Sequence, residues 1–183
     1  MKTLTLSLIL LSLACSSGTH VNIHAGKMIV PGEGTDEVQV GMSKAEIIDL
    51  LGEPGTVDDG GRVLGYRENC GLDFFLADGE HVVEIRFGQS FRGRLPSRIK
   101  VGSRMHDVFK AYGTPTERLE VDERAMGTQN RVLYITPDWY KITYKRLGLC
   151  FYFSSQKKVS QIVIFQPLPD RNIRVEPQKQ GSR

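Results

Sequence analysis

The sequence is poor in the side chains that most often carry metal or acid–base chemistry. Its 183 residues include only three cysteines and four histidines, and the histidines are His20, His24, His81 and His106. His20 and His24 are four residues apart, but they lie in a leader containing Gly and Ser, where no stable helix would align them. None of the four has the spacing to cysteine or carboxylate that a zinc site needs. We therefore predict no metal site and no cofactor.

The local signatures of nucleophilic and phosphate chemistry are also absent. Cys70 is followed by no catalytic motif, Cys150 falls within a strand pattern, and no serine lies in a nucleophile elbow. Asp58-Asp59-Gly60-Gly61 is an acidic turn, which would repel a phosphate group rather than bind it. These absences predict a protein that is not an enzyme and has no small-molecule substrate.

The total charge has no strong excess of either sign. Lys and Arg number 24 against 21 Asp and Glu, and removal of the first 14 residues takes away only Lys2, which lowers the net charge from +3 to +2. Nucleic-acid-binding domains are normally far more basic, so we predict no nucleic-acid partner. After residue 14 no segment is apolar enough to be expected to cross a membrane.

The one long apolar run lies at the N-terminus. Residues Leu4 to Ala14 follow a single early positive charge at Lys2, which is the arrangement of a signal peptide. The run is shorter than the roughly 20 residues that a membrane-spanning helix needs. We predict that residues 1–14 are removed on export. The alternative is a buried core helix.

The residues around this cleavage point, Leu11-Ser12-Leu13-Ala14-Cys15, resemble the bacterial lipobox. In that family a small residue precedes the cysteine that receives the lipid, but Ser12 stands where the lipobox normally has Leu. Ser12 and Ala14 also fit ordinary signal peptidase, which would cut the same bond without lipidation. The resemblance implies lipid attachment at Cys15. Because Ser16 rather than Asp follows, it also implies an outer-membrane lipoprotein, facing the periplasm or the cell surface.

An internal repeat dominates the rest of the chain. Residues 40–54, VGMSKAEIIDLLGEP, match residues 101–115, VGSRMHDVFKAYGTP, without a gap, and each copy predicts a short helix. Ser43 and Glu46 form a capping-box pattern in the first copy, and Ser103 is the expected cap in the second. A glycine near the end of each copy predicts the helix C-terminus, and the proline that follows prevents continuation.

Two blocks that alternate as strands do follow each helix, and they correspond between the copies: 71–76 with 148–153, and 82–87 with 159–164. The turns inside each predicted hairpin correspond as well, and so do the strands that precede it: 77–80 with 154–157, and 62–67 with 141–145. The offset between copies grows from 61 residues at the helices to 77 at the hairpins. An insertion is therefore predicted in the second copy, near 121–140.

The motif at residues 41–54, GMSKAEIIDLLGEP, resembles the opening of the small outer-membrane lipoprotein family that includes SmpA, OmlA and BamE. The doubled arrangement, over about residues 36–167, is similar to the wider β-lactamase-inhibitor-like group. The resemblance implies an α+β fold of two tandem helix-plus-antiparallel-hairpin repeats, with the helices on one face of a shared antiparallel sheet. It also implies a binding or assembly module, but it does not carry over the identity of a partner.

These features divide the chain into parts, expected in this order: a signal peptide at 1–14, lipid attachment and tether at 15–35, a first repeat at 36–90, a basic linker at 91–98, a second repeat at 99–167 and a flexible tail at 168–183. The linker lies within residues 85–106, which contain no acidic residue. Its neighbourhood includes the basic residues Arg92, Arg94, Arg98, Lys100 and Arg104. They predict either a basic surface for an anionic partner, such as lipid headgroups or envelope polymers, or only a solvated linker.

Strand alternation predicts which side chains share a face of the sheet. Those expected to pack under the helices are Leu72, Phe74, Leu76, Leu149, Phe151 and Phe153. The opposite face is the predicted partner-binding surface, and its residues are Phe75, Tyr152, Val163 and Phe165, with Asp73, Glu84, Arg86 and Cys150 beside them. The alternative is that segments outside the repeats cover this face.

Two further predictions leave alternatives open. Trp139 and Tyr140, in the insertion, are either exposed anchors for a partner or plugs at the edge of the core. Cys70 and Cys150 either form a disulfide in an oxidising compartment or remain buried thiols.

The sequence therefore predicts an exported, lipid-anchored, non-enzymatic protein-binding module of the cell envelope. Its membrane contact is through the lipid on Cys15, and its partner is an envelope protein that it helps to assemble or maintain. The alternatives are an inhibitor of an exported hydrolase and a surface adhesin.

Overall fold

The computed structural model describes residues 27–120 and 138–168, which contain two helices and eight strands. The first half of this part contains α1 (Lys44–Leu51), β1 (Thr56–Asp58), β2 (Val63–Tyr66), β3 (Leu72–Ala77) and β4 (His81–Phe87). The second half contains α2 (Met105–Tyr112), β5 (Glu117–Glu120), β6 (Asp138–Tyr144), β7 (Leu149–Ser154) and β8 (Val159–Phe165). Short 3-10 turns follow β1 and β6, at Asp59–Gly61 and Lys145–Leu147.

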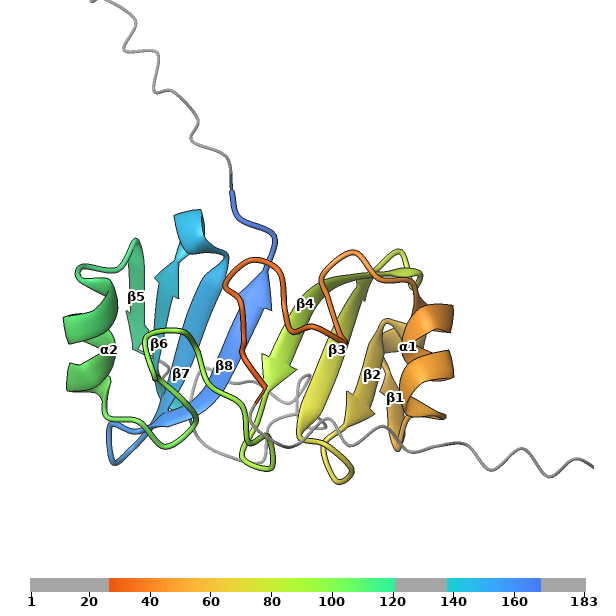
Figure 1. The fold of residues 1–183 in the computed structure, drawn as a ribbon, viewed down its shortest axis with the longest axis horizontal. Coiled ribbons are helices and arrows are strands. Elements are labelled where there is room, and N and C mark those ends of the chain that lie inside the picture. Colours follow the sequence, from red (N-terminus) through yellow and green to blue (C-terminus); the bar gives the residue numbers. More distant parts are fainter. Residues whose placement is uncertain (1–26, 121–137, 169–183) are drawn as a thin grey trace, which may run out of the picture.

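All these strands belong to one antiparallel sheet, with the order β1-β2-β3-β4-β8-β7-β6-β5 (Figure 1). Each half is a meander of four consecutive strands, and the halves meet where β4 pairs with β8. The register at this seam pairs Glu84 with Phe165 and Arg86 with Val163. Side chains from both halves form one hydrophobic core, so the described residues fold as one unit.

The predicted fold class is wrong. The structure is chiefly one eight-stranded sheet, and each half contributes a four-stranded meander rather than a hairpin unit. Each helix has only eight residues and lies at one end of the sheet, so the helices do not form a covering layer (Figure 1). The middle of the sheet is covered instead by the non-helical segments 27–41 and 88–104.

These covering segments are part of the packed domain. Ile29, Phe91, Leu95 and Ile99 are all buried in the core. The end of the predicted tether, from residue 27, and the whole predicted linker therefore supply core side chains. The arginine side chains of the linker remain exposed between these buried positions.

Equivalent hydrogen bonds fasten each helix to its own half of the sheet. The hydroxyl of Tyr66 donates to the carbonyl of Gly52 (2.7 Å), and the hydroxyl of Tyr144 donates to the carbonyl of Gly113 (3.0 Å). Both glycines end a helix with a positive φ angle, 79° and 71°, which glycine adopts more readily than other residues. Burial raises the pKa of Tyr66 to about 12, so this phenol stays a donor at ordinary pH.

The two helices begin differently. In α1 the Ser43 hydroxyl accepts a hydrogen bond from the backbone N–H of Glu46 (3.2 Å), and the Glu46 carboxylate accepts one from the backbone N–H of Ser43 (2.7 Å). This is the predicted capping box. The predicted cap of the second helix is wrong, because the N-cap of α2 is Arg104 and its side chain makes no capping bond. The Ser103 hydroxyl accepts instead from the backbone N–H of Lys100 (3.0 Å).

Substituting Ser43→Ala is expected to lower the free energy of unfolding by about 1 kcal/mol, because the Glu46 N–H loses its acceptor. Urea denaturation followed by circular dichroism measures the change. Ser103→Ala is the matched control, since Ser103 lies at the start of α2 without capping it, and its effect should be smaller. Equal losses in the two variants would show that the capping box has no special role.

Several predictions concern residues outside the described ranges. They are the signal peptide at 1–14, lipid attachment at Cys15, the tether up to residue 26, the insertion at 121–137 and the tail from residue 169. These stay predictions.

Candidate functional site

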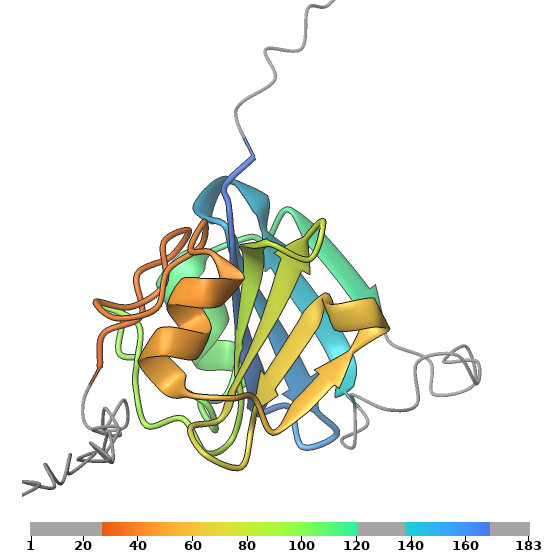
Figure 2. The same cartoon turned by 90° about the vertical axis from the view of Figure 1, so that its right-hand side faces the viewer.

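One face of the sheet carries the side chains that alternate away from the core, and we call it the open face. Its central row crosses every strand, through Thr56, Gly65, Asp73, Arg86, Val163, Cys150, Thr143 and Glu117. Shorter rows flank it, made by Phe75, Glu84 and Phe165 and by Gln161, Tyr152 and Lys141. Segments 27–41 and 91–104 lie on the other side of the sheet, and no described segment lies across the open face (Figure 2). Residues 88–90 border this face at one edge, where they line a pocket with Asp73, Arg86 and Gln161.

The strand residues expected to pack under the helices are buried, but the non-helical segments cover much of that side instead of a helical layer. Six alternating residues are at most 4% exposed and pack in the core: Leu72, Phe74, Leu76, Leu149, Phe151 and Phe153. Since successive side chains of a strand point to opposite faces, the residues between them belong to the open face.

The centre of the open face combines aromatic rings with cations. The Arg86 guanidinium lies 4.0 Å from the ring centroid of Phe75 and 5.8 Å from that of Tyr152. The Lys141 ammonium lies 5.6 Å from the centroid of Tyr152. Arg86 also donates from Nε to the Glu84 carboxylate (2.5 Å). We call these five residues the aromatic–cationic centre, and their mutual contacts hold both rings in place.

The phenol of Tyr152 is poised for hydrogen bonding. Burial raises its pKa, while the positive charges of Arg86 and Lys141 act in the opposite direction and do not cancel the rise. The hydroxyl therefore stays protonated at neutral pH and can both donate and accept a hydrogen bond.

A groove of about 280 Å³ lies along the open face beside this centre. It is lined by residues of five neighbouring strands, among them Glu84, Lys141, Cys150, Tyr152 and Phe165. A lining that spans β4 to β8 makes a long, shallow depression rather than an enclosed pocket. Small-molecule sites are normally clefts that enclose most of the ligand surface, so this shape favours part of a macromolecule.

A smaller polar pocket, of about 180 Å³, opens at the seam between the halves. Asp73 is 3% exposed there and accepts a hydrogen bond from Nε of Arg67 through its Oδ2 atom (2.7 Å). Among the described residues, Asp73 Oδ1 and Gln161 Oε1 are buried without a hydrogen-bond partner. Buried acceptors are normally satisfied, so Asp73 and Gln161 offer acceptors to a bound group, beside the guanidinium groups of Arg67 and Arg86 that also line the pocket.

The predicted partner-binding residues fall into different settings. Phe75, Tyr152 and Phe165 are half-buried on the open face, whereas Val163 lies on that face but is only 2% exposed. Tyr140 packs against the core, which is the second of its two predicted alternatives. The backbone of Trp139 lies in β6, but its side chain is outside the described part of the structure.

Lys141 and Gln161 belong to the same site but are missed by reasoning from the sequence. Each is a direct cross-strand neighbour of Tyr152, on β6 and β8. The alternation within 141–145 does place Lys141 on a definite side of its strand. Only the register between strands shows that this side is the one that carries Tyr152.

Cys70 and Cys150 are free, buried thiols, so the disulfide alternative is not found. Burial raises the pKa of each thiol to about 11. Cys70 donates to the carbonyl of Tyr66 (3.4 Å), while Cys150 lies in the central row of the open face. Neither has the lowered pKa of a reactive cysteine.

At pH 8 we expect both thiols of the folded protein to react only slowly with an aromatic disulfide reagent, since a pKa of about 11 leaves a thiolate fraction on the order of 0.1%. Unfolding in guanidinium without reductant should release both. The assay uses a Cys15→Ser variant, so that these two thiols alone are counted. Rapid reaction of the folded protein, or two thiols that stay masked after unfolding, would contradict the structure.

The described residues contain neither a cluster of metal ligands nor a membrane-spanning helix. Within residues 27–120 and 138–168, no three side chains of His, Cys, Asp or Glu are grouped so that they could hold a metal ion. In that same part of the chain, no helix has the length and apolar character needed to span a membrane.

The geometry defines a protein built on one eight-stranded antiparallel sheet with two short helices, in which the described segments leave the second face of the sheet uncovered. The sequence matches no protein-family model and no curated protein. Among solved structures, the chain is similar to a DUF4309 family protein, YjgB, from Bacillus subtilis subsp. subtilis str. 168. The TM-score is 0.52 with 17% sequence identity, over 74% of this chain and 88% of YjgB. At this identity the likeness concerns the fold alone.

Proposed function

We propose that this protein is an exported, lipid-anchored, non-enzymatic protein-binding module of the cell envelope, and that it holds its partner on the open face. The observation that carries the proposal is the aromatic–cationic centre, which places Phe75, Tyr152 and Arg86 together on a face that no described segment covers. Aromatic and arginine side chains that become buried dominate the binding energy of many protein interfaces.

The size of the open face supports a macromolecular partner. Eight strands about 4.8 Å apart span about 34 Å, and strands of about six residues are about 20 Å long, which gives an area of about 700 Å². One side of a standard protein interface buries about 800 Å². The sheet is therefore wide enough for a single partner domain. Contact would fall on the half-buried Phe75, Tyr152 and Phe165, because Asp73, Cys150 and Val163 in the central row are at most 3% exposed.

The ordering of the centre favours binding as well. Arg86 is held between the Phe75 ring and the Glu84 carboxylate before any partner arrives. Side chains that are already fixed lose less conformational entropy when an interface forms. The pairing with Glu84 also balances the charge of Arg86, so that burial by a partner does not strand an isolated charge.

The polar pocket offers the partner a specific contact. A backbone N–H or a side-chain amide of a partner protein would donate to Asp73 Oδ1 and Gln161 Oε1. The export and anchoring parts of the proposal rest on the sequence, through the apolar run after Lys2 and the lipobox-like residues before Cys15.

A pull-down from detergent-solubilised envelope of the cell that makes the protein tests this function. The bait is the mature chain, compared with its Phe75→Ala/Tyr152→Ala variant and with Leu147→Ala, an exposed apolar residue in the turn after β6. We expect the wild type and Leu147→Ala to retain an envelope protein that the double variant loses. If all three baits retain the same proteins, the open face is not the binding site. If the retained protein is a soluble hydrolase that loses its activity, the chain is an inhibitor instead.

A further inference from the structure

The charges of the described residues are divided sharply between the two halves. Residues 27–87 contain five basic and 13 acidic residues, a net charge of −8. Residues 88–120 and 138–168 contain 12 basic and four acidic residues, a net charge of +8. The two halves lie at opposite ends of the long axis, with α1 at the acidic end and α2 at the basic end (Figure 1). The described part of the protein is therefore a large electric dipole along its sheet.

Most of the ion pairs among the described residues lie in the acidic half, where they neutralise most of its cations. Four of the five ion pairs given by the described residues lie in the acidic half: Lys27–Glu37, Arg62–Asp59, Arg67–Asp73 and Arg86–Glu84. They neutralise most of the few cations of that half. The basic half contributes one such pair, Lys145–Glu117. Arg104, Lys157 and Lys158 in this half are exposed.

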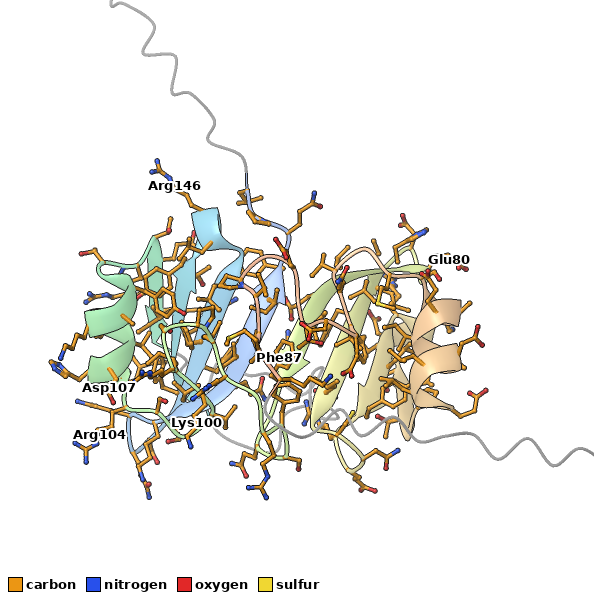
Figure 3. All side chains as sticks on the ribbon, in the orientation of Figure 1. Glu80, Phe87, Lys100, Arg104, Asp107 and Arg146 are labelled. Carbon is orange, nitrogen blue, oxygen red and sulfur yellow. The ribbon has the colours of Figure 1, made fainter. Side chains whose placement is uncertain are left out.

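A cluster of basic residues lies at the start of α2. Arg104 forms a β-bridge with Lys158, and the Met105 backbone N–H donates to the carbonyl of Lys157 (2.9 Å), which brings the start of α2 to the turn between β7 and β8. Arg104, Lys157 and Lys158 line a hollow there with the partly apolar surface of Met105 and Phe109. Figure 3 shows Arg104 and Lys100 at this end of the molecule and Glu80 at the other.

We propose that this basic end, formed by Lys100, Arg104, Lys157 and Lys158, docks on the anionic headgroups of a lipid membrane. The inference rests on the lipid anchor of the proposed function, because the anchor selects a membrane among possible anionic surfaces. Clusters of four to eight basic residues near a membrane bind anionic lipid electrostatically. Repulsion of the acidic half then orients the molecule, with α2 toward the membrane and α1 away from it.

The path of the chain agrees with this orientation. At the start of the described part, Lys27 accepts from the backbone N–H of Arg94 (3.0 Å), and Ile29 donates to the Arg94 carbonyl (2.8 Å). The described part of the chain thus begins beside residues 91–98, on the side of the sheet opposite the open face (Figure 2). The residues between Cys15 and Lys27 reach at most about 40 Å when extended. A sheet standing on its basic end would leave the open face accessible from the side.

Vesicle sedimentation tests the proposal with the whole mature chain carrying Cys15→Ser, so that no lipid contributes. The probes are vesicles of phosphatidylcholine alone and vesicles with equal parts of phosphatidylglycerol. We expect binding only to the anionic vesicles and release at high salt. Each basic residue contributes roughly fivefold to the partition coefficient, so Lys157→Glu/Lys158→Glu should lower it at least about 25-fold.

The matched control is Lys44→Glu/Arg62→Glu, which makes the same change in net charge on the acidic half and should alter binding little. Equal losses in the two double variants, equal binding to both kinds of vesicle, or no binding would overturn the proposal. The Phe75→Ala/Tyr152→Ala variant should still bind anionic vesicles. The vesicle assay therefore tests membrane docking separately from partner binding. It does so even if no protein partner is found.

Discussion

Replacing Phe75 and Tyr152 together by alanine should weaken binding of the envelope partner at least about 100-fold. Both rings lie in the aromatic–cationic centre, and each packs against the guanidinium of Arg86. Hot-spot side chains of this kind contribute about 2 kcal/mol or more each, and every 1.4 kcal/mol is a tenfold change in affinity. Titration calorimetry with the purified partner measures the effect.

The variant should remain folded, because both residues lie outside the hydrophobic core. A thermal melt of the double variant serves as the folding control, and Leu147→Ala serves as the surface control in the same titration. If the double variant binds the partner with unchanged affinity and melts at an unchanged temperature, the open face is not the binding site. If the double variant loses affinity but also melts at a lower temperature, the single variant Phe75→Leu is tested instead. It keeps the apolar volume and should bind more weakly without unfolding.

The largest expected effect on stability comes from Phe151→Ala, which should lower the free energy of unfolding by about 4 kcal/mol. Phe151 is fully buried on β7. The centroid of its ring lies 5.7 Å from the ring centroid of Tyr112 on α2, and 6.2 Å from the ring centroids of Tyr144 and Phe153. Removing it leaves a cavity where helix and sheet meet in the second half, and urea denaturation measures the loss.

The same experiment tests whether the two halves fold as one unit. Because β4 pairs with β8 and one core runs through both halves, unfolding of the variant should stay a single transition in fluorescence and circular dichroism. Leu147→Ala, at an exposed position, should change stability little. Two separate transitions in the variant would mean that the halves are independent domains.

Local structure was largely accessible from the sequence because its determinants are local. The Ser43–Glu46 capping box, the glycines that end both helices, and the alternation along β3 and β7 each involve residues a few positions apart. The strands β1 and β5 could not be recognised from the sequence. They have three and four residues, and their sequences, TVD and ERLE, show no long apolar alternation.

The covering layer could not be predicted in the same way. Ile29, Phe91 and Leu95 lie in segments with the composition of a tether or a linker, and only their burial against the sheet reveals their role. The resemblance to helix-and-hairpin repeats assigned this role to the helices. Eight-residue helices at the two ends of an eight-stranded sheet are too short to fulfil it.

The candidate site was partly visible. Alternation alone placed Phe75 and Tyr152 on the face away from the core, whereas Lys141 and Gln161 required the register of β6, β7 and β8. The division of charge was hidden for a different reason. The net charge of the whole chain is +3, in which the −8 and +8 of the two described halves cancel.

Site-specific photo-crosslinking in the living cell shows whether the open face holds a protein partner. Benzoyl-phenylalanine in place of Tyr152 keeps an aromatic ring on the open face, and the same group in place of Asp49, exposed on α1, is the control. We expect a discrete protein adduct from position 152 on illumination and none from position 49. Adducts from position 49 alone, or no protein adduct from position 152, would contradict the claim that the open face holds the partner.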